Sequence, residues 1–335
     1  MIGALIYNPY RDCDFFSFFS VLFIRGLGLL SGQIGIENLA SDEIQILVLI
    51  GLCLSSAFIG VFLVLKQMTM MANALCHTIL LGIVLAFLLL HPFISSHDVA
   101  VSFIPLKVLL LASFISALLT TIFTQLLIQV TKVQEDASIG LVFTFLFAIA
   151  VVLVTLYTKN MHIGTEAIMG NIDALDVDDV YVVSLVALLN CVVFSIGFKG
   201  FTTVTFDPLF AKSVGLSTAF FNYFMMFLTA ATCIAAFRAV GVLLVLTFFV
   251  GPPLMARFFT NQMKKLVLLS FLIPSVASIA SVALSRHILF VYHTPVSTAG
   301  LVVCVFTLIY LALILFFPKK GLISSIFNKK ACKRF

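Results

Sequence analysis

Three polar residues in one apolar stretch of the chain are of types whose side chains can bind metal ions. Asn73, Cys76 and His77 lie in the segment KQMTMMANALCHTILLG, which begins at Lys66. Residues four apart share one face of a helix, so the Asn73 amide oxygen and a His77 nitrogen can converge on one cation. This spacing indicates a metal path, with Cys76 as a weaker candidate. A single histidine in a membrane helix is about as often a hydrogen-bonding group between helices.

The surrounding sequence is typical of a membrane protein. Hydrophobic residues make up 62% of the chain and charged residues 10%, and the mean hydropathy is +1.22. Spans of about 20 residues leave room for roughly eight or nine transmembrane helices and for no soluble catalytic domain. The apolar runs lack the alternation of outer-membrane strands, so we expect an all-α, polytopic helical membrane protein. The predicted spans are 45–65, 69–90, 104–130, 138–157, 180–198, 218–237, 240–257, 266–285 and 297–317.

Basic residues gather on one side of this predicted topology. They are Lys66, Lys132, Lys199, Lys212, Arg257, Lys264 and Lys265, with Lys319, Lys320, Lys329, Lys330, Lys333 and Arg334 in the tail. The positive-inside rule makes this side cytoplasmic and places the C-terminus inside, which explains the net charge of +5 better than nucleic-acid binding does. The opposite connections are acidic. Their carboxylates either attract cations or a docking partner, or only hydrate the outer loops.

The spans predict one membrane domain between two flanking segments. Residues 1–44 form an N-terminal extension, in which 15–30 is apolar but short and carries Arg25. A charge at the bilayer centre is costly, so we expect an interfacial or re-entrant helix there. The transmembrane domain is expected at 45–317 and a basic cytoplasmic tail at 318–335.

A short amphipathic helix is predicted between two spans on the cytoplasmic side, in FDPLFAKSVG (206–215). Asp207 fits its N-cap and Pro208 its first turn, while Leu209, Phe210 and Val214 give it an apolar face. Such a helix either docks in a groove of another protein or rests on the lipid surface.

A helix break is predicted near the inner end of the span 240–257. Gly251, Pro252 and Pro253 follow one another there, and a break in a membrane helix needs internal partners or a lined cavity. This break is either a gate or a structural kink. In the preceding span, Ala231, Ala235 and Ala239 recur every four residues, which lets helices approach closely.

Several motifs of enzymes are missing from the sequence. It contains no GxxxxGK[ST] phosphate loop, no HExxH and no GxSxG. The seven cysteines include no CxxC pair and indicate no disulfide framework. We therefore expect a protein that is not an enzyme, holds no permanent cofactor and has no ATPase site of its own.

Six segments together resemble the permease subunits of bacterial manganese, zinc and iron ABC transporters. The resemblance runs from about residue 51 to residue 317. Its segments are GVFLVLKQMTMMANALCHTILLGIVLAF (60–87), KVQEDASIGLVFTFLFAIAVVL (132–153), EAIMGNI (166–172), FDPLFAKSVG (206–215), AFRAVGVLLVLTFFVGPPLMAR (236–257) and YHTPVSTAGLVV (292–303).

The resemblance implies a multi-pass protein of the bacterial inner membrane that imports manganese, zinc or iron. Two permeases would pair, each docked to a cytoplasmic ATP-binding subunit, while an extracytoplasmic metal-binding protein delivers the metal. FDPLFAKSVG looks like the coupling helix, with Asp207, Phe210, Ala211 and Gly215 at matched positions and Pro208 in its first turn.

The candidate metal-binding segment departs from the family pattern at two positions. The family commonly has aspartate where Asn73 stands and serine where Cys76 stands, followed by the histidine. A unit charge at ~4 Å is worth about 4 kcal/mol at an effective dielectric near 20, so Asn73 is expected to hold metal more weakly. A second, non-identical permease could supply the missing acid, so we favour a heterodimer over a homodimer. The alternatives are a stand-alone secondary carrier or channel, and a membrane scaffold without transport.

Overall fold

The computed structural model is a bundle of helices. It describes residues 9–10, 14–31, 39–90, 106–131, 134–157 and 172–316, and these contain no strand. The elements are α1 (Phe15–Leu30), α2 (Ser41–Leu65), α3 (Thr69–Leu90), α4 (Leu106–Thr131), α5 (Glu135–Tyr157), the short 3₁₀ helix η4 (Ile172–Ala174), α7 (Val177–Phe206), α8 (Pro208–Ser213), α9 (Thr218–Phe259), α10 (Met263–Tyr292) and α11 (Thr298–Phe316). The predicted all-α class is confirmed. The basic tail at 318–335 lies outside the described residues.

Each of the nine predicted spans falls largely on a helix. Six helical segments in the described ranges are long and apolar enough to cross a membrane, and four shorter apolar stretches accompany them. The two spans predicted at 218–237 and 240–257 lie on α9, which bends at Gly241, where φ is 72° and ψ is 168°. Positive φ is accessible to glycine at little cost, so this residue lets the chain turn between two helical halves.

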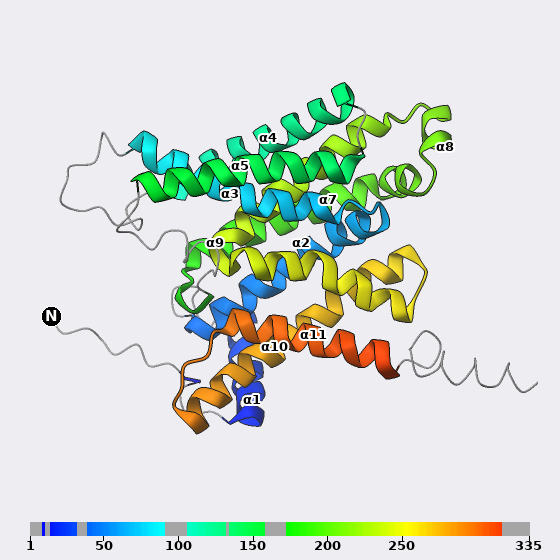
Figure 1. The fold of residues 1–335 in the computed structure, drawn as a ribbon. Coiled ribbons are helices and arrows are strands. Elements are labelled where there is room, and N and C mark those ends of the chain that lie inside the picture. Colours follow the sequence, from blue (N-terminus) through cyan, green and yellow to red (C-terminus); the bar gives the residue numbers. More distant parts are fainter. Residues whose placement is uncertain are drawn as a thin grey trace, which may run out of the picture.

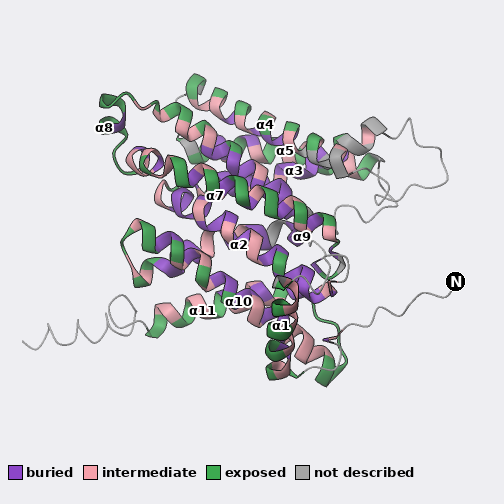
Figure 2. Cartoon of the chain, turned by 180° about the vertical axis from the view of Figure 1, so that it is seen from behind, coloured by how far each residue is buried: buried purple, intermediate pink, exposed green. Residues whose placement is uncertain are grey.

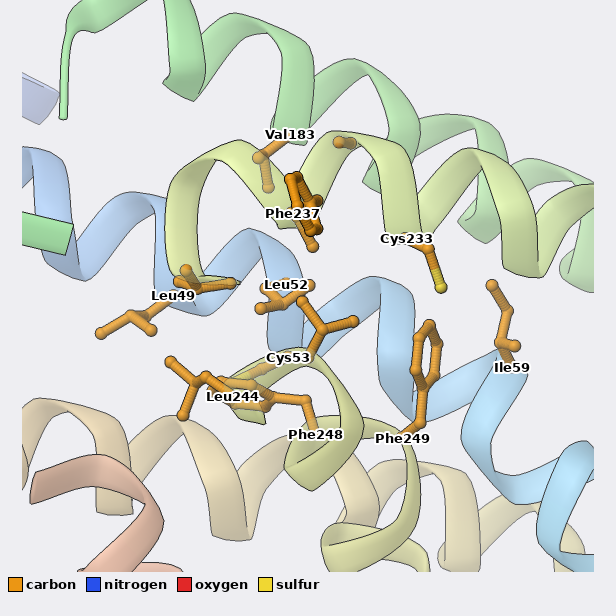
Figure 3. Packing of buried hydrophobic residues seen from close by; sticks show 14 of the residues in the cluster. Leu49, Leu52, Cys53, Ile59, Val183, Cys233, Phe237, Leu244, Phe248 and Phe249 are labelled. Carbon is orange, nitrogen blue, oxygen red and sulfur yellow. The ribbon is translucent and has the colours of Figure 1, made fainter. Parts of the chain in front are cut away.

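Helix α2 forms the centre of the bundle and packs against α7, α9 and α10. Figure 1 shows α2 flanked by these helices, with α3, α4 and α5 forming a layer on one side of it. Buried residues concentrate on α2 and on the facing sides of its neighbours in Figure 2. In Figure 3, Leu49, Leu52 and Cys53 of α2 meet side chains from both halves of α9. The two halves of α9 are thus held around one helix.

The predicted helix break at Gly251, Pro252 and Pro253 is not a break in the structure. Helix α9 continues through both prolines to Phe259, and its non-helical residue is Gly241. Proline lacks the N–H that would bond the carbonyl four residues earlier, so Pro253 frees the Phe249 carbonyl. Gly60 of α2 lies against this carbonyl so closely that an added Cβ would overlap its oxygen. The freed Phe249 carbonyl therefore lies against Gly60, where α2 and α9 are in close contact.

Helix α1 runs crosswise to the long helices at the edge of the bundle (Figure 1). Its 16 residues span about 24 Å, less than the roughly 30 Å of a hydrocarbon core. Arg25 donates to both carboxylate oxygens of Glu43 in α2, at 2.5 and 3.2 Å. The Tyr10 hydroxyl donates to Glu43 at 2.9 Å, and burial together with this carboxylate raises the pKa of Tyr10. These polar contacts attach the N-terminal part of the chain to α2.

Candidate metal path and coupling helix

The metal-binding side chains of α3 face two different neighbouring helices. The His77 ring lies against α5, with its centroid 5.3 Å from that of Phe143 and 5.5 Å from that of Phe147. Cys76 is 1% exposed and faces α9, where its sulfur lies 3.3 Å from the sulfur of Cys233. Consecutive residues of a helix point about 100° apart, which explains the separation.

Asn73 and His77 share a face of α3, as the sequence predicted, and both are half-buried. Within the described part of the chain, no three side chains from histidine, cysteine, aspartate and glutamate come together to hold a metal ion. The structure pairs Cys76 with Cys233 rather than with His77. His77 and Cys76 thus lie in separate contacts, the first against α5 and the second against α9.

A polar contact that the sequence analysis did not single out joins α7 to α9 inside the bundle. Asn190 is fully buried, and its amide nitrogen donates to the Thr232 hydroxyl at 2.8 Å. The Asn190 side-chain oxygen has no hydrogen-bond partner among the described residues. Intramembrane amides mark pathways or helix contacts, so an asparagine inside the predicted span 180–198 was a usable signal.

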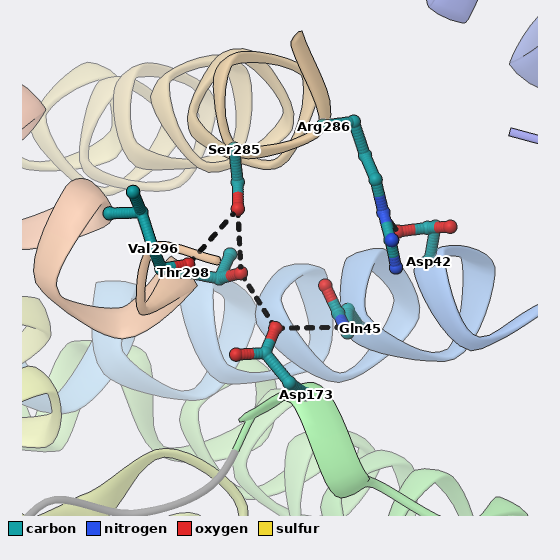
Figure 4. A network of polar contacts seen from close by, with 7 residues as sticks. All are labelled: Asp42, Gln45, Asp173, Ser285, Arg286, Val296 and Thr298. Carbon is teal, nitrogen blue, oxygen red and sulfur yellow. Dashed lines mark hydrogen bonds and ion pairs between the residues drawn. The ribbon is translucent and has the colours of Figure 1, made fainter. Parts of the chain in front are cut away.

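Two carboxylates at one end of the bundle, Asp42 and Asp173, take part in contacts between helices. Figure 4 shows Asp173 accepting hydrogen bonds from Gln45 at 3.3 Å and from Thr298 at 2.8 Å. Asp42 is fully buried and forms an ion pair with Arg286 of α10. These contacts fasten α2, η4, α10 and α11 together. Asp42 and Asp173 therefore stabilise the packing of these helices.

Helix α8 projects from the opposite end of the bundle, between α7 and α9 (Figure 1). The Asp207 carboxylate caps it by accepting from the Phe210 amide at 2.9 Å, and Pro208 occupies its first turn. Ala211 is buried, whereas Leu209 and Phe210 are 78% and 56% exposed. Gly215 ends the turn with φ at 84°, a conformation that favours glycine. The predicted helix is confirmed, and it presents an uncovered apolar face.

Comparison with protein-family models gives a match over residues 43–317, to the model described as the ABC 3 transport family. This match covers most of the chain. The protein belongs to the ABC 3 transport family. The family region begins at Glu43, in the first turn of α2, so α1 precedes it and contacts its first residue.

Several relatives from bacteria share the membrane region. A probable metal transport system membrane protein of Chlamydia muridarum is 38% identical over 304 residues, which cover 91% of this chain and 93% of that protein. The manganese transport system membrane protein MntD of Bacillus subtilis is 33% identical, covering 83% and 92%. The zinc transport system membrane protein TroD of Treponema pallidum is 30% identical, covering 86% and 77%.

A solved structure shares the fold of this family member. PsaBC from Streptococcus pneumoniae in complex with Fab superposes with a TM-score of 0.70, covering 88% of this chain and 97% of the matched chain, at 21% identity. At that identity the likeness supports the helical architecture. The predicted polytopic helical membrane protein and the predicted family are both confirmed.

Proposed function

We propose that this chain is the permease subunit of an ABC importer that carries a divalent transition metal: manganese, zinc or iron. The observation that carries the proposal is the family match over residues 43–317, together with relatives named for manganese and zinc transport. ATP is hydrolysed on a separate cytoplasmic subunit, since this sequence holds no phosphate-binding loop.

Helix α8 is the proposed docking site for the ATP-binding subunit. Its exposed residues Leu209 and Phe210 are carried on a short helix that Asp207 caps and Ala211 anchors in the bundle. A lipid-resting helix would also expose apolar residues, but the resemblance of FDPLFAKSVG to the coupling helix of metal permeases favours docking to a protein. The inner membrane, a cytoplasmic C-terminus and an α8 that faces the cytoplasm follow from the basic connections.

The proposed path is lined by Asn73 and His77, with Cys76 beside them on α3. Metal delivered by an extracytoplasmic binding protein enters between two paired permeases, of which the second is expected to be non-identical because Asn73 lacks a charge. Weak holding suits a path, because the ion must also leave. Gly251, Pro252 and Pro253 remain candidates for a gate, through the close approach of Pro253 to Gly60 of α2 rather than through a helix break.

Co-purification with the ATP-binding subunit tests the docking. We expect Phe210→Asp to lose the subunit, because the change places a charge in an apolar contact. Phe259→Asp is the matched control, since Phe259 is also an exposed phenylalanine, 51% accessible, at the end of α9. Retention of the ATP-binding subunit by Phe210→Asp would contradict the assignment of α8.

A further inference from the structure

We propose that Cys76 and Cys233 form a two-thiolate site in the metal path that favours zinc and similar thiophilic divalent cations over manganese. The inference rests on the proposed function, because it names the class of cargo for the same path. Its evidence, however, is the position and chemistry of two side chains.

The two thiols come from different helices and meet in the interior. Cys76 of α3 and Cys233 of α9 are 1% and 0% exposed, and their sulfurs are 3.3 Å apart. Figure 3 shows Cys233 among buried side chains of α2 and α9. Asn73 lies three residues before Cys76 on α3 and is half-buried.

The geometry fits a tetrahedral ion with a small adjustment. Zinc binds thiolate at about 2.3 Å, which places two tetrahedral sulfur ligands roughly 3.8 Å apart. The sulfurs of Cys76 and Cys233 would separate by about half an ångström to hold zinc. A linear two-thiolate ion needs sulfurs roughly 4.6 Å apart at the same bond length, a larger movement.

The available donors are soft ones. All 14 aspartates and glutamates lie outside the middle of the predicted spans. Those within described α-helices stand in the first turn: Asp42 and Glu43 of α2, Glu135 and Asp136 of α5, and Asp178 and Asp179 of α7, while Asp173 lies in the short 3₁₀ helix η4. Manganese is best suited by carboxylate and water oxygen, whereas thiolate and imidazole suit zinc. The middle of the spans therefore contains thiols and an imidazole, which suit zinc, and lacks the carboxylates that suit manganese.

Charge balance also favours a divalent cation at this pair. Each thiol releases its proton to water as its sulfur bonds to the metal, so one divalent ion and two thiolates give a neutral complex and two free protons. A neutral complex avoids the large cost of an isolated charge in the apolar interior. A single thiolate would leave a net positive charge there.

Cadmium binding to the purified, reduced full-length chain in detergent tests the site without any transport assay. We expect cadmium to give an ultraviolet thiolate-to-metal charge-transfer band that zinc abolishes by competition and manganese does not. Cys76→Ser/Cys233→Ser should lose the band, and each single variant should bind cadmium on the order of 100-fold more weakly. Cys53→Ser is the matched control, since Cys53 is also fully buried but lies 3.9 Å from a serine hydroxyl rather than beside a thiol.

A band that persists in the double variant, or that is lost equally in Cys53→Ser, would overturn the site. So would the absence of cadmium binding to the wild-type chain. Serine nearly preserves the volume of cysteine, and a single symmetric elution peak identifies variants that remain folded. In the assembled transporter, we expect the double variant to lose zinc uptake about tenfold relative to manganese uptake, and an unchanged ratio would overturn cargo selection. If the wild-type transporter moved neither metal, the proposed function would fail while the binding result still decided the site.

Discussion

At the scale of single residues, His77 is the side chain on which the proposed path depends most. It is half-buried between α3 and α5 and is framed by Phe143 and Phe147. A ring in this position can offer nitrogen to a passing ion while its faces remain packed. The sequence predicted that Asn73 and His77 share a face, because helical spacing alone decides that.

We expect His77→Ala to reduce metal uptake by about tenfold in the complete transporter, which corresponds to a loss of roughly 1.4 kcal/mol along the path. Radiometal uptake into vesicles that contain all subunits measures this. Met70→Ala is the control, because Met70 lies on the same helix and is 54% exposed. Uptake by His77→Ala at the wild-type rate would remove His77 from the mechanism.

The ion pair between Asp42 and Arg286 is a second residue-level test. The Asp42 side chain is fully buried, whereas the Arg286 side chain retains 22% exposure. We expect Asp42→Asn to cost about 2 kcal/mol, below the 3–5 kcal/mol of a fully buried pair because Arg286 is partly solvated. The thermal unfolding midpoint in detergent should fall, and Asp42→Asn/Arg286→Gln should recover part of the loss. A midpoint equal to that of the wild type would show that the pair is dispensable.

The sequence did not predict the pairing of these residues, for a physical reason. Asp42 and Arg286 are 244 positions apart, and Cys76 and Cys233 are 157 apart. Composition and charge rules place each of them at a helix end or inside a span, but only packing decides which side chains meet. Asp42 belongs by sequence to the acidic connections, whereas the structure buries it in the ion pair with Arg286.

At the scale of elements, hydrophobic run length predicted the spans well. Each apolar run of about 20 residues became a helix, since backbone amides in hydrocarbon must bond within their own segment. The turn between the two halves of α9 lies at Gly241, where the spans predicted at 218–237 and 240–257 meet. The additional break predicted at Gly251, Pro252 and Pro253 is absent, because the helix continues through both prolines. A proline removes one backbone N–H donor but can keep helical dihedral angles, so the helix continues through it. Gly241 instead adopts a positive φ, which turns the chain between the two halves of α9.

The close contact of α2 with the second half of α9 gives an element-level prediction. We expect Gly60→Ala to destabilise the protein by about 1–3 kcal/mol, because its methyl group would overlap the Phe249 carbonyl and would lie 3.2 Å from Pro253. Gly140→Ala in α5 is the matched control, since an added Cβ there meets nothing within 4 Å. The unfolding midpoint should fall for the first variant and not for the second. Equal unfolding midpoints for the two variants would contradict a tight contact between α2 and α9 at Gly60.

At the scale of the whole molecule, the two ends of the bundle differ in how firmly they are packed. The polar contacts of Asp42, Glu43 and Asp173 fasten one end of the bundle, and α8 protrudes from the other. Alternating access requires the helices around a path to move against such fixed points. We propose that the ATP-binding subunit transmits its motion to the bundle through α8, because this exposed helix lies at the end opposite to these contacts.

The central claim is that this chain moves metal only when an ATP-binding subunit drives it. The most direct measurement is metal accumulation in liposomes that contain the permease with its ATP-binding and second permease subunits, supplied with metal-loaded binding protein. We expect accumulation that requires ATP, stops with Phe210→Asp and is absent for this chain alone. Metal flux through the purified chain by itself, driven by an ion gradient and indifferent to ATP, would contradict the account and indicate a stand-alone carrier or channel.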